Sequence, residues 1–210
     1  MLKAFLDSIP SHVKVVAATK YGDSYQLRRL YENGIKDFGE NRVDSFLKKR
    51  SDLNNLDITW HFIGHLQKNK AKKVIQEIDF LHSLDSLELA KLIQKYRKQP
   101  LKCFIEVSIN EEENKNGIKV CEANEFIRSL LEFDKIEVVG LMMMAKQDSS
   151  EESLNEQFAN LRILKENIEN DLQIKIPYLS MGMSDDYKQA ISQGATHVRL
   201  GRILFNLLIN

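Results

Sequence analysis

Lys20 stands at the end of an apolar run, residues 13–19, in which valine and alanine dominate. A run of this kind is typical of a buried strand, and an amine at its end is placed to condense with an aldehyde. Far downstream, residues 181–187 and 197–202 each contain glycine close to serine or arginine. Backbone N–H groups at helix starts bind phosphate, and glycine lets the backbone approach it closely. The residue types therefore predict a site for a phosphorylated aldehyde.

Arg199 adds a third feature to this predicted site. Side chains alternate along a strand, so Arg199 and Gly201 share one face, and Arg199 is expected to point inward. A buried guanidinium needs an acceptor, which is either a cofactor ring nitrogen or a carboxylate within the fold. Pyridoxal phosphate (PLP) combines an aldehyde, a phosphate and a ring nitrogen. It is the predicted cofactor, held by Lys20 as a Schiff base.

Each signal taken alone also has an ordinary explanation. A lysine at a strand end is more often a solvated surface residue than a reactive one. The stretch around Ser184 fits a common turn in which the serine caps the following helix. His61 and His65 have the spacing of a metal pair, but they lack the intervening glutamate of a metalloprotease helix, so no metal is predicted.

Composition narrows the class of function. The 210 residues include 30 basic and 30 acidic side chains, which cancel to a formal charge of zero. Such a chain has no general attraction for nucleic acid or an anionic membrane, and a solvated helix face explains the lysines within residues 68–73. Two cysteines without metal-ligand spacing indicate a reducing compartment. No signal peptide or membrane span is recognised, so we expect a soluble, cytoplasmic protein.

Short β-branched runs alternate with helical patterns, as in successive βα units around a parallel sheet. The predicted strands cover residues 13–19, 36–39, 58–64, 80–83, 102–109, 136–142, 176–180 and 197–200. The clearest predicted helices cover residues 86–98, 122–131 and 151–170. No linker or repeat interrupts the pattern, which indicates one domain over residues 1–210. Eight βα units favour an α/β fold of the (β/α)8 TIM-barrel type, with a doubly wound open sheet as the alternative.

A barrel would bring the candidate residues together. Its functional site lies at the carboxyl ends of the strands, and phosphate usually binds the loops after the seventh and eighth strands. Residues 181–187 and 201–202 occupy those two loops in the predicted order of elements. Residues 111–117 are expected to form another loop at this mouth of the barrel.

A series of motifs resembles the pyridoxal phosphate homeostasis protein family, which is related to the N-terminal barrel domain of alanine racemases. Besides the strand that ends in Lys20, they are Phe-Gly-Glu-Asn (38–41), Trp-His-Phe-Ile-Gly-His-Leu-Gln-Lys-Asn-Lys (60–70), His-Ser-Leu-Asp (82–85), Gly-Leu-Met (140–142), Met-Gly-Met-Ser-Asp-Asp (181–186) and Val-Arg-Leu-Gly (198–201). Their order and spacing agree with the family from residue 13 to about residue 205. The resemblance implies a single TIM-type barrel that binds PLP.

The resemblance also implies roles for individual residues. Lys20 would hold PLP as a Schiff base, Ser184 and the backbone of Gly201 and Arg202 would bind its phosphate, and Arg199 would face the pyridine nitrogen. The further lining residues that it implies are Asn41, His61 and Met142. An arginine opposite the ring nitrogen keeps that nitrogen unprotonated, which weakens the cofactor as an electron sink. The resemblance therefore implies PLP storage without catalytic turnover.

The sequence departs from the family's usual pattern after Lys20 and again after Gly201. Tyr21, Gly22 and Asp23 follow the lysine where Thr-Lys-Pro is common. Arg202 follows Gly201 where a threonine or serine is usual, which removes a hydroxyl and adds a charge that could pair with phosphate.

Two functions share all of these residues. The first is a monomeric carrier in intracellular PLP homeostasis, with PLP-dependent apoenzymes as candidate recipients. The second is a PLP-dependent amino-acid racemase, which needs another acid or base on the opposite face of the cofactor. Racemases of the related fold supply a tyrosine from an additional β-domain, and no segment here resembles that domain. Tyr21 lies close enough to Lys20 to keep the racemase as the alternative.

Overall fold

The computed structural model of this chain describes residues 1–110 and 116–209. Its strands are β1 (Lys14–Ala18), β2 (Asp37–Glu40), β3 (Thr59–Phe62), β4 (Phe80–Leu84), β5 (Leu101–Ser108), β6 (Ile118–Lys119), β7 (Ile136–Met142), β8 (Tyr178–Ser180) and β9 (His197–Leu200). All strand pairs are parallel, in the order β4-β3-β2-β1-β9-β8-β7-β5-β6. A further β4–β5 pairing closes the sheet into an eight-stranded barrel within the described residues, with β6 attached to the edge of β5.

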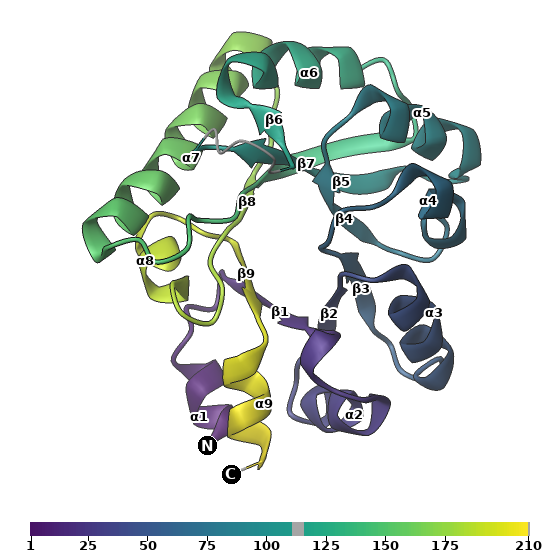
Figure 1. Ribbon diagram of the computed structural model, residues 1–210, viewed down its shortest axis with the longest axis vertical. Coiled ribbons are helices and arrows are strands. Elements are labelled where there is room, and N and C mark those ends of the chain that lie inside the picture. Colours follow the sequence, from purple (N-terminus) through teal and green to yellow (C-terminus); the bar gives the residue numbers. More distant parts are fainter. Residues whose placement is uncertain (111–115, 210) are drawn as a thin grey trace.

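Helices form an outer layer around this barrel (Figure 1). They are α1 (Leu2–Asp7), α2 (Ser24–Glu32), α3 (Val43–Asp52), α4 (Lys68–Val74), α5 (Leu87–Tyr96), α6 (Ala123–Leu130), α7 (Glu151–Leu172), α8 (Tyr187–Ser192) and α9 (Arg202–Ile209), with short 3₁₀ turns η1 (Thr19–Tyr21) and η2 (Val120–Glu122). The helices α1 and α9 lie side by side, which brings the two ends of the chain together.

Local sequence signals explain where the helices begin and end. Asp23 accepts a hydrogen bond from the Gln26 backbone N–H, and the Gln26 side-chain oxygen accepts one from the Asp23 backbone N–H, which forms a capping box at the start of α2. Ser86 and Ser150 cap α5 and α7 through their hydroxyls. At the end of α7, Gln173 adopts the left-handed conformation that commonly terminates a helix.

Strand alternation divides the core into two parts. Outward-facing strand residues pack against the helices in one large cluster, in which the Trp60 ring contacts the rings of Phe38 and Phe46. Inward-facing residues form a separate cluster inside the barrel, made of Phe80, Phe104, Val139 and Met142 with Tyr178 at its edge. The barrel is therefore filled by side chains below its mouth.

The predicted single barrel is confirmed, and the open-sheet alternative is wrong because β4 pairs with β5. All eight predicted strands are present, with end positions that differ by no more than two residues. One placement is corrected: β1 ends at Ala18, so Lys20 lies in the turn η1 rather than at the strand end itself. The two-residue strand β6 was too short to show in the sequence pattern. Most of the predicted loop at residues 111–117, namely residues 111–115, lies outside the described residues.

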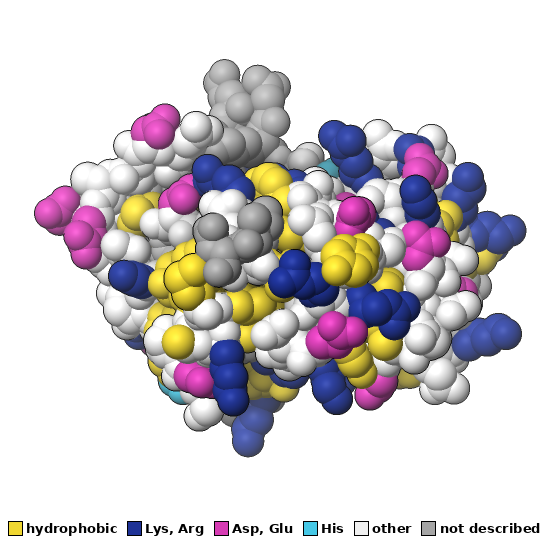
Figure 2. Space-filling model, turned by 90° about the horizontal axis from the view of Figure 1, so that it is seen from below, with side chains coloured by type: hydrophobic (Ala, Val, Ile, Leu, Met, Phe, Trp, Pro, Cys, Tyr) yellow, Lys and Arg dark blue, Asp and Glu magenta, His cyan; other side chains and the backbone are white. Residues whose placement is uncertain are grey.

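The surface agrees with the balanced composition. On the face shown in Figure 2, Lys and Arg side chains are interspersed with Asp and Glu, and neither sign forms a continuous patch. Within the described part of the chain, we find no helix whose length and hydropathy would let it cross a membrane.

Candidate functional site

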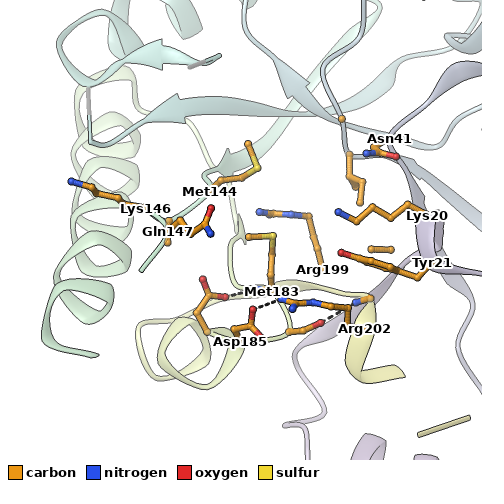
Figure 3. A pocket seen from close by; sticks show the side chains of 18 of the residues that line it. Lys20, Tyr21, Asn41, Met144, Lys146, Gln147, Met183, Asp185, Arg199 and Arg202 are labelled. Carbon is orange, nitrogen blue, oxygen red and sulfur yellow. Dashed lines mark hydrogen bonds and ion pairs between the residues drawn. The ribbon is translucent and has the colours of Figure 1, made fainter. Parts of the chain in front are cut away.

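A cavity of about 1000 Å³ opens at the carboxyl ends of the barrel strands. Figure 3 shows Lys20 and Arg199 projecting into it from η1 and β9. Six of the predicted site residues line this cavity: Lys20, Asn41, Ser184, Arg199, Gly201 and Arg202. The fold thus assembles residues that lie more than 180 positions apart in the sequence.

A buried ion pair fixes the turn that carries Lys20. The Lys49 ammonium donates to Glu40 Oε2 at 2.7 Å and to the Thr19 carbonyl at 2.6 Å. The Thr19 hydroxyl lies 2.8 Å from the same carboxylate oxygen. Thr19 directly precedes Lys20 in η1. Lys49 on α3 therefore holds the backbone from which the Lys20 side chain reaches into the cavity.

The Glu40 carboxylate also holds the next loop of the barrel. Its Oε1 accepts hydrogen bonds from the backbone N–H groups of Asn41 and Arg42, at 2.8 and 3.3 Å, and its Oε2 accepts one from the Ser45 hydroxyl. Burial raises the Glu40 pKa, but the bonds from Lys49 and these partners outweigh it and leave the pKa below its ordinary value. Glu40 is therefore ionised at neutral pH and ties the Lys20 turn to Asn41.

Tyr21 connects the first and last loops of the barrel. The Lys20 amine lies 4.7 Å from the centre of the Tyr21 ring, within range of a cation–π contact. The same ring covers Gly201, where an added Cβ would lie 2.5 Å from a Tyr21 carbon. Only glycine leaves room for this packing, so the unusual Tyr21 and the glycine form one unit.

The two predicted phosphate loops meet directly. The Gly201 N–H donates to the Ser184 hydroxyl oxygen at 3.2 Å, which leaves the hydroxyl hydrogen available for another acceptor. Gly182 turns the first loop with a φ of +90°, and an added Cβ there would lie 2.5 Å from Ala190 Cβ. Helix α9 begins immediately after Gly201, so its first-turn N–H groups point toward the same place.

The charge of Arg202 suggested a pair with phosphate, but its side chain has a carboxylate partner in the structure. Its guanidinium forms an ion pair with Asp185 at the rim of the cavity (Figure 3), and both side chains are exposed. The backbone of Arg202 at the start of α9 remains beside Ser184 and Gly201.

Arg199 is buried on the inward face of β9, as predicted. It donates to the Ser180 carbonyl at 2.8 Å, the Ser180 hydroxyl at 2.7 Å and the Met143 carbonyl at 2.8 Å. Within the described residues it forms no ion pair with a carboxylate, so that explanation for its burial is not supported. Burial lowers the Arg199 pKa to about 10, which leaves the group cationic at neutral pH. A guanidinium has five N–H donors, so two remain for a ligand.

Glu106 is a cavity residue that sequence reasoning missed. It lies on β5, almost fully buried, and no side chain or backbone group of the described residues hydrogen-bonds its carboxyl. Burial raises the Glu106 pKa to about 7, with a further increase from Asp85 and a partial opposing effect of Arg199. Its signal was a single acid within the apolar run 103–107.

Two predicted lining residues lie elsewhere. His61 is buried inside the barrel and stacks on Phe80, and Met142 belongs to the interior cluster beneath the cavity. Neither lines the cavity wall. Met144, two residues beyond Met142 at the end of β7, lines the cavity instead.

His61 and His65, whose spacing is that of a metal pair, point to different surroundings. His65 lies near Asp85, 3.4 Å away, whereas His61 faces the barrel interior. Across the described ranges, no group of three or more His, Cys, Asp or Glu side chains is arranged to hold a metal ion.

Comparison with known proteins first shows the class of fold to which the chain belongs. Residues 2–208 match the family model of the alanine racemase N-terminal domain. An alanine racemase structure from Clostridium difficile 630 superposes with a TM-score of 0.79 at 15% identity, over 97% of this chain and 56% of the racemase. The class is therefore a barrel fold, which in the racemase forms one part of a longer chain.

The particular family follows from closer relatives. The chain is 38% identical over 195 residues to the pyridoxal phosphate homeostasis protein of Aquifex aeolicus, which covers 91% of this chain and 86% of the relative. PipY of Synechococcus elongatus, in a structure without PLP, superposes with a TM-score of 0.92 at 31% identity over 97% of both chains. A second PipY structure, with PLP bound, gives 0.89 at 27% identity over 98% of this chain and 100% of PipY. The chain belongs to the pyridoxal phosphate homeostasis protein family.

Proposed function

We propose that this protein binds PLP in the cavity at the barrel mouth, through a Schiff base to Lys20, and serves intracellular PLP homeostasis. The observation that carries the proposal is the convergence of Lys20, the Ser184–Gly201 contact and Arg199 on one cavity. The PLP-bound structure of its relative PipY and the names of its curated relatives support it.

The residues present fit this cofactor. An anion is favoured where the Ser184 hydroxyl and the first-turn N–H groups of α9 meet. Among the described residues the buried Asn41 Oδ1 has no hydrogen-bond partner, so a polar group of a ligand would satisfy it. Gly201 permits close approach of the backbone, whereas Arg199 supplies two further donors at the cavity floor.

The chemistry of PLP when bound is that of its aldehyde, which condenses with an amine and releases one water molecule. Lys20 must lose a proton before its amine can attack, and reprotonation accompanies release. The role of Glu40 and Lys49 is to hold the Lys20 turn, and the role of Tyr21 is to support its side chain. Tyr21 is not an acid or base on the side of the cavity opposite Lys20, because its ring lies beside Lys20 and against Gly201.

The proposed carrier role follows from the charge of Arg199. A cation opposite a pyridine nitrogen lowers the pKa of that nitrogen and keeps it neutral, which withholds the electron sink that amino-acid chemistry requires. We therefore propose storage and release without turnover, and transfer of PLP to apoenzymes that lack it.

The test is an absorption spectrum of the purified protein with PLP, before and after borohydride reduction, followed by peptide mass mapping. The expected result is a reducible adduct on Lys20 in the wild type and in Lys146→Ala, which removes another cavity lysine. Lys20→Ala is expected to give no adduct while keeping the circular dichroism spectrum of the wild type. An adduct that maps elsewhere in the wild type would contradict the assignment.

Turnover is tested separately with the loaded protein and L-alanine. We expect no D-alanine by chiral chromatography over a period in which an authentic racemase reaches equilibrium. The transfer role is tested by mixing loaded protein with a PLP-free apoenzyme and following the return of that enzyme's activity. Accumulation of D-alanine at a rate proportional to protein concentration would replace the carrier role with the racemase.

A further inference from the structure

A row of polar side chains crosses the closed interior of the barrel and ends at Arg199. Arg199 donates to Ser180 Oγ at 2.7 Å, Ser180 Oγ lies 2.8 Å from His82 Nδ1, and His82 Nε2 lies 2.8 Å from His61 Nδ1. His61 Nε2 lies 3.0 Å from Asp37 Oδ1, at the opposite end of the barrel. We call these five residues, Asp37, His61, His82, Ser180 and Arg199, the barrel relay.

The middle of the barrel relay is shielded from water. His61, His82 and Ser180 are fully buried, and aromatic rings cover both histidines. His61 stacks on Phe80 with ring centres 4.6 Å apart, and His82 stacks on Phe104 at 4.3 Å. Each polar atom must therefore find its partner within the relay, because an unpaired buried group costs about 1–3 kcal/mol.

The chemistry of the end groups determines the direction of every bond. A guanidinium can only donate, so Ser180 Oγ accepts from Arg199 and its own hydrogen is free for His82 Nδ1. His82 then carries its hydrogen on Nε2 and donates to His61 Nδ1, and His61 donates from Nε2 to the Asp37 carboxylate. The relay thus specifies one tautomer for each histidine.

The ionisation states agree with this count of hydrogens. Burial lowers the pKa of His82 well below its ordinary value, and His61, His197 and Arg199 lower it further. Burial also lowers the pKa of His61, although Asp37 opposes the shift. Burial raises the Asp37 pKa, but the His61 hydrogen bond and the nearby Lys14 leave it below its ordinary value. His61 and His82 are thus both neutral, and each donates one N–H hydrogen bond between the Arg199 cation and the Asp37 anion.

We infer that Ser180, His82 and His61 are positioning residues that orient Arg199 at the cavity floor and couple it to Asp37 at the far end of the barrel. The inference rests on the proposed function only for the consequence in PLP binding, since the relay itself exists in the protein without ligand. It adds three residues below the cavity wall to those that determine how the cofactor ring nitrogen is held.

The first experiment needs no substitution. Two-bond ¹H–¹⁵N correlation spectra of the ligand-free protein, labelled at its five histidines, report which ring nitrogen carries hydrogen. The expected result is a neutral Nε2–H tautomer for both His61 and His82 between pH 6 and 8, with assignments from His61→Gln and His82→Gln. A hydrogen on Nδ1 of either ring in the wild type overturns the inference.

The second experiment breaks the barrel relay next to Arg199. Ser180→Ala is expected to mix the tautomers of His82, to shift the Arg199 side-chain ¹⁵N signals, and to weaken PLP binding about tenfold. Ser83→Ala is the matched control, because it removes an equally buried hydroxyl on β4 whose bonding among the described residues is to the Gly64 carbonyl alone. Ser180→Thr restores the hydroxyl and is expected to restore all three readouts. Equal effects of Ser180→Ala and Ser83→Ala would overturn the inference.

The third experiment tests coupling across the barrel. Asp37→Asn lets the amide donate to His61 and reverse the tautomers, so it is expected to shift the Arg199 signals without touching the cavity. Asp79→Asn is the control at the same end, since Asp79 accepts from the Trp60 backbone N–H rather than from a histidine. Unchanged Arg199 signals in Asp37→Asn would refute the coupling. Because these signals are read in the ligand-free protein, failure of PLP binding alone leaves this result intact.

Discussion

The closed interior of the barrel and its open mouth satisfy their polar groups in different ways. In the interior, His61 and His82 are neutral, stacked on aromatic rings and bonded to one another. At the mouth, Asn41 Oδ1, the Glu106 carboxyl and two N–H groups of Arg199 have no partner among the described residues. Unused hydrogen-bonding capacity thus separates a binding surface from a packed core, even where both are rich in polar residues.

One interior atom departs from this contrast. His197 Nε2 is buried and has no hydrogen-bond partner in the part of the chain that the structure describes, while its Nδ1 lies 2.9 Å from the Thr196 hydroxyl. Burial lowers the His197 pKa to about 3, so the ring is neutral at physiological pH and leaves a single dipole unsatisfied. The mouth, in contrast, leaves two N–H donors of the charged Arg199 unused among the described residues, which is the more costly arrangement without a ligand.

The largest expected effect comes from removing the ion pair below the mouth. Glu40→Ala leaves the Lys49 ammonium buried without its carboxylate and is expected to lower the free energy of unfolding by about 3–5 kcal/mol. Urea denaturation measures this change. Glu166→Ala removes an exposed partner of Arg162 and is expected to cost less than about 1 kcal/mol. A loss of less than about 1 kcal/mol in Glu40→Ala would show that the Lys20 turn is held by other contacts.

The next effect depends on pH and concerns Glu106. Its pKa is about 7 in the folded protein and 4.5 as the ordinary value, so below pH 4.5 the carboxyl is protonated in both states. As pH rises from 4.5 to 7 the unfolded state loses the proton first, and the folded state loses about 3 kcal/mol of relative stability. Above pH 7 this loss is complete.

Glu106→Gln removes this titration. In the ligand-free protein, the variant is expected to gain about 3 kcal/mol relative to wild type between pH 4 and pH 8, as measured by urea denaturation at both values. Glu132→Gln, at an exposed position, provides the control and should show no such gain. Parallel pH profiles of wild type and Glu106→Gln would mean that the carboxyl is not held away from water.

A smaller effect concerns the packing of Tyr21 on Gly201. In Gly201→Ala the new methyl group would overlap the Tyr21 ring, so the ring must move and the Lys20 contact with it is lost. We expect PLP affinity to fall about tenfold, in line with the typical cost of 1–3 kcal/mol for overpacking. In a Tyr21→Ala background the same substitution should have little further effect, and isothermal titration of all four proteins tests this dependence. Additive losses would indicate that Gly201 acts without Tyr21.

Most of the fold followed from the sequence because βα units have strong local signals. Residues 136–142 and 197–200 were predicted with the observed strand limits, and the start of α7 coincided with the predicted helix. Lys20, Arg199 and the two loops that hold Ser184, Gly201 and Arg202 were also identifiable from residue type and the predicted order of elements, whereas Asn41 was implied by the family resemblance alone. The height of a residue along the barrel axis was not identifiable from the sequence, because it depends on how the strands are staggered. The family resemblance implied that His61 lines the pocket, although it lies in the interior.

Partners across the fold were also beyond the sequence. Ser180 and His82 are 98 positions apart, and nothing in their local sequence indicates that their side chains meet. Glu106 was visible as an acid in an apolar run, but only its position beside the cavity distinguishes it from a core carboxylate with a cationic partner. Long-range pairing, rather than element type, is what the structure contributes to the site.

The smallest expected effect is at the rim, where Arg202 and Asp185 form an exposed ion pair. Arg202→Ala removes the side chain but keeps the backbone N–H at the start of α9, so PLP affinity is expected to fall less than about threefold. Asp185→Ala frees the guanidinium and is the informative companion, because a free cation next to the phosphate loops would then strengthen binding. Titration at two salt concentrations separates these contributions, since screening weakens a rim charge far more than a buried one. A loss of tenfold or more in Arg202→Ala would move this side chain from the rim into the phosphate site, and would show that the ion pair with Asp185 opens when the anion binds.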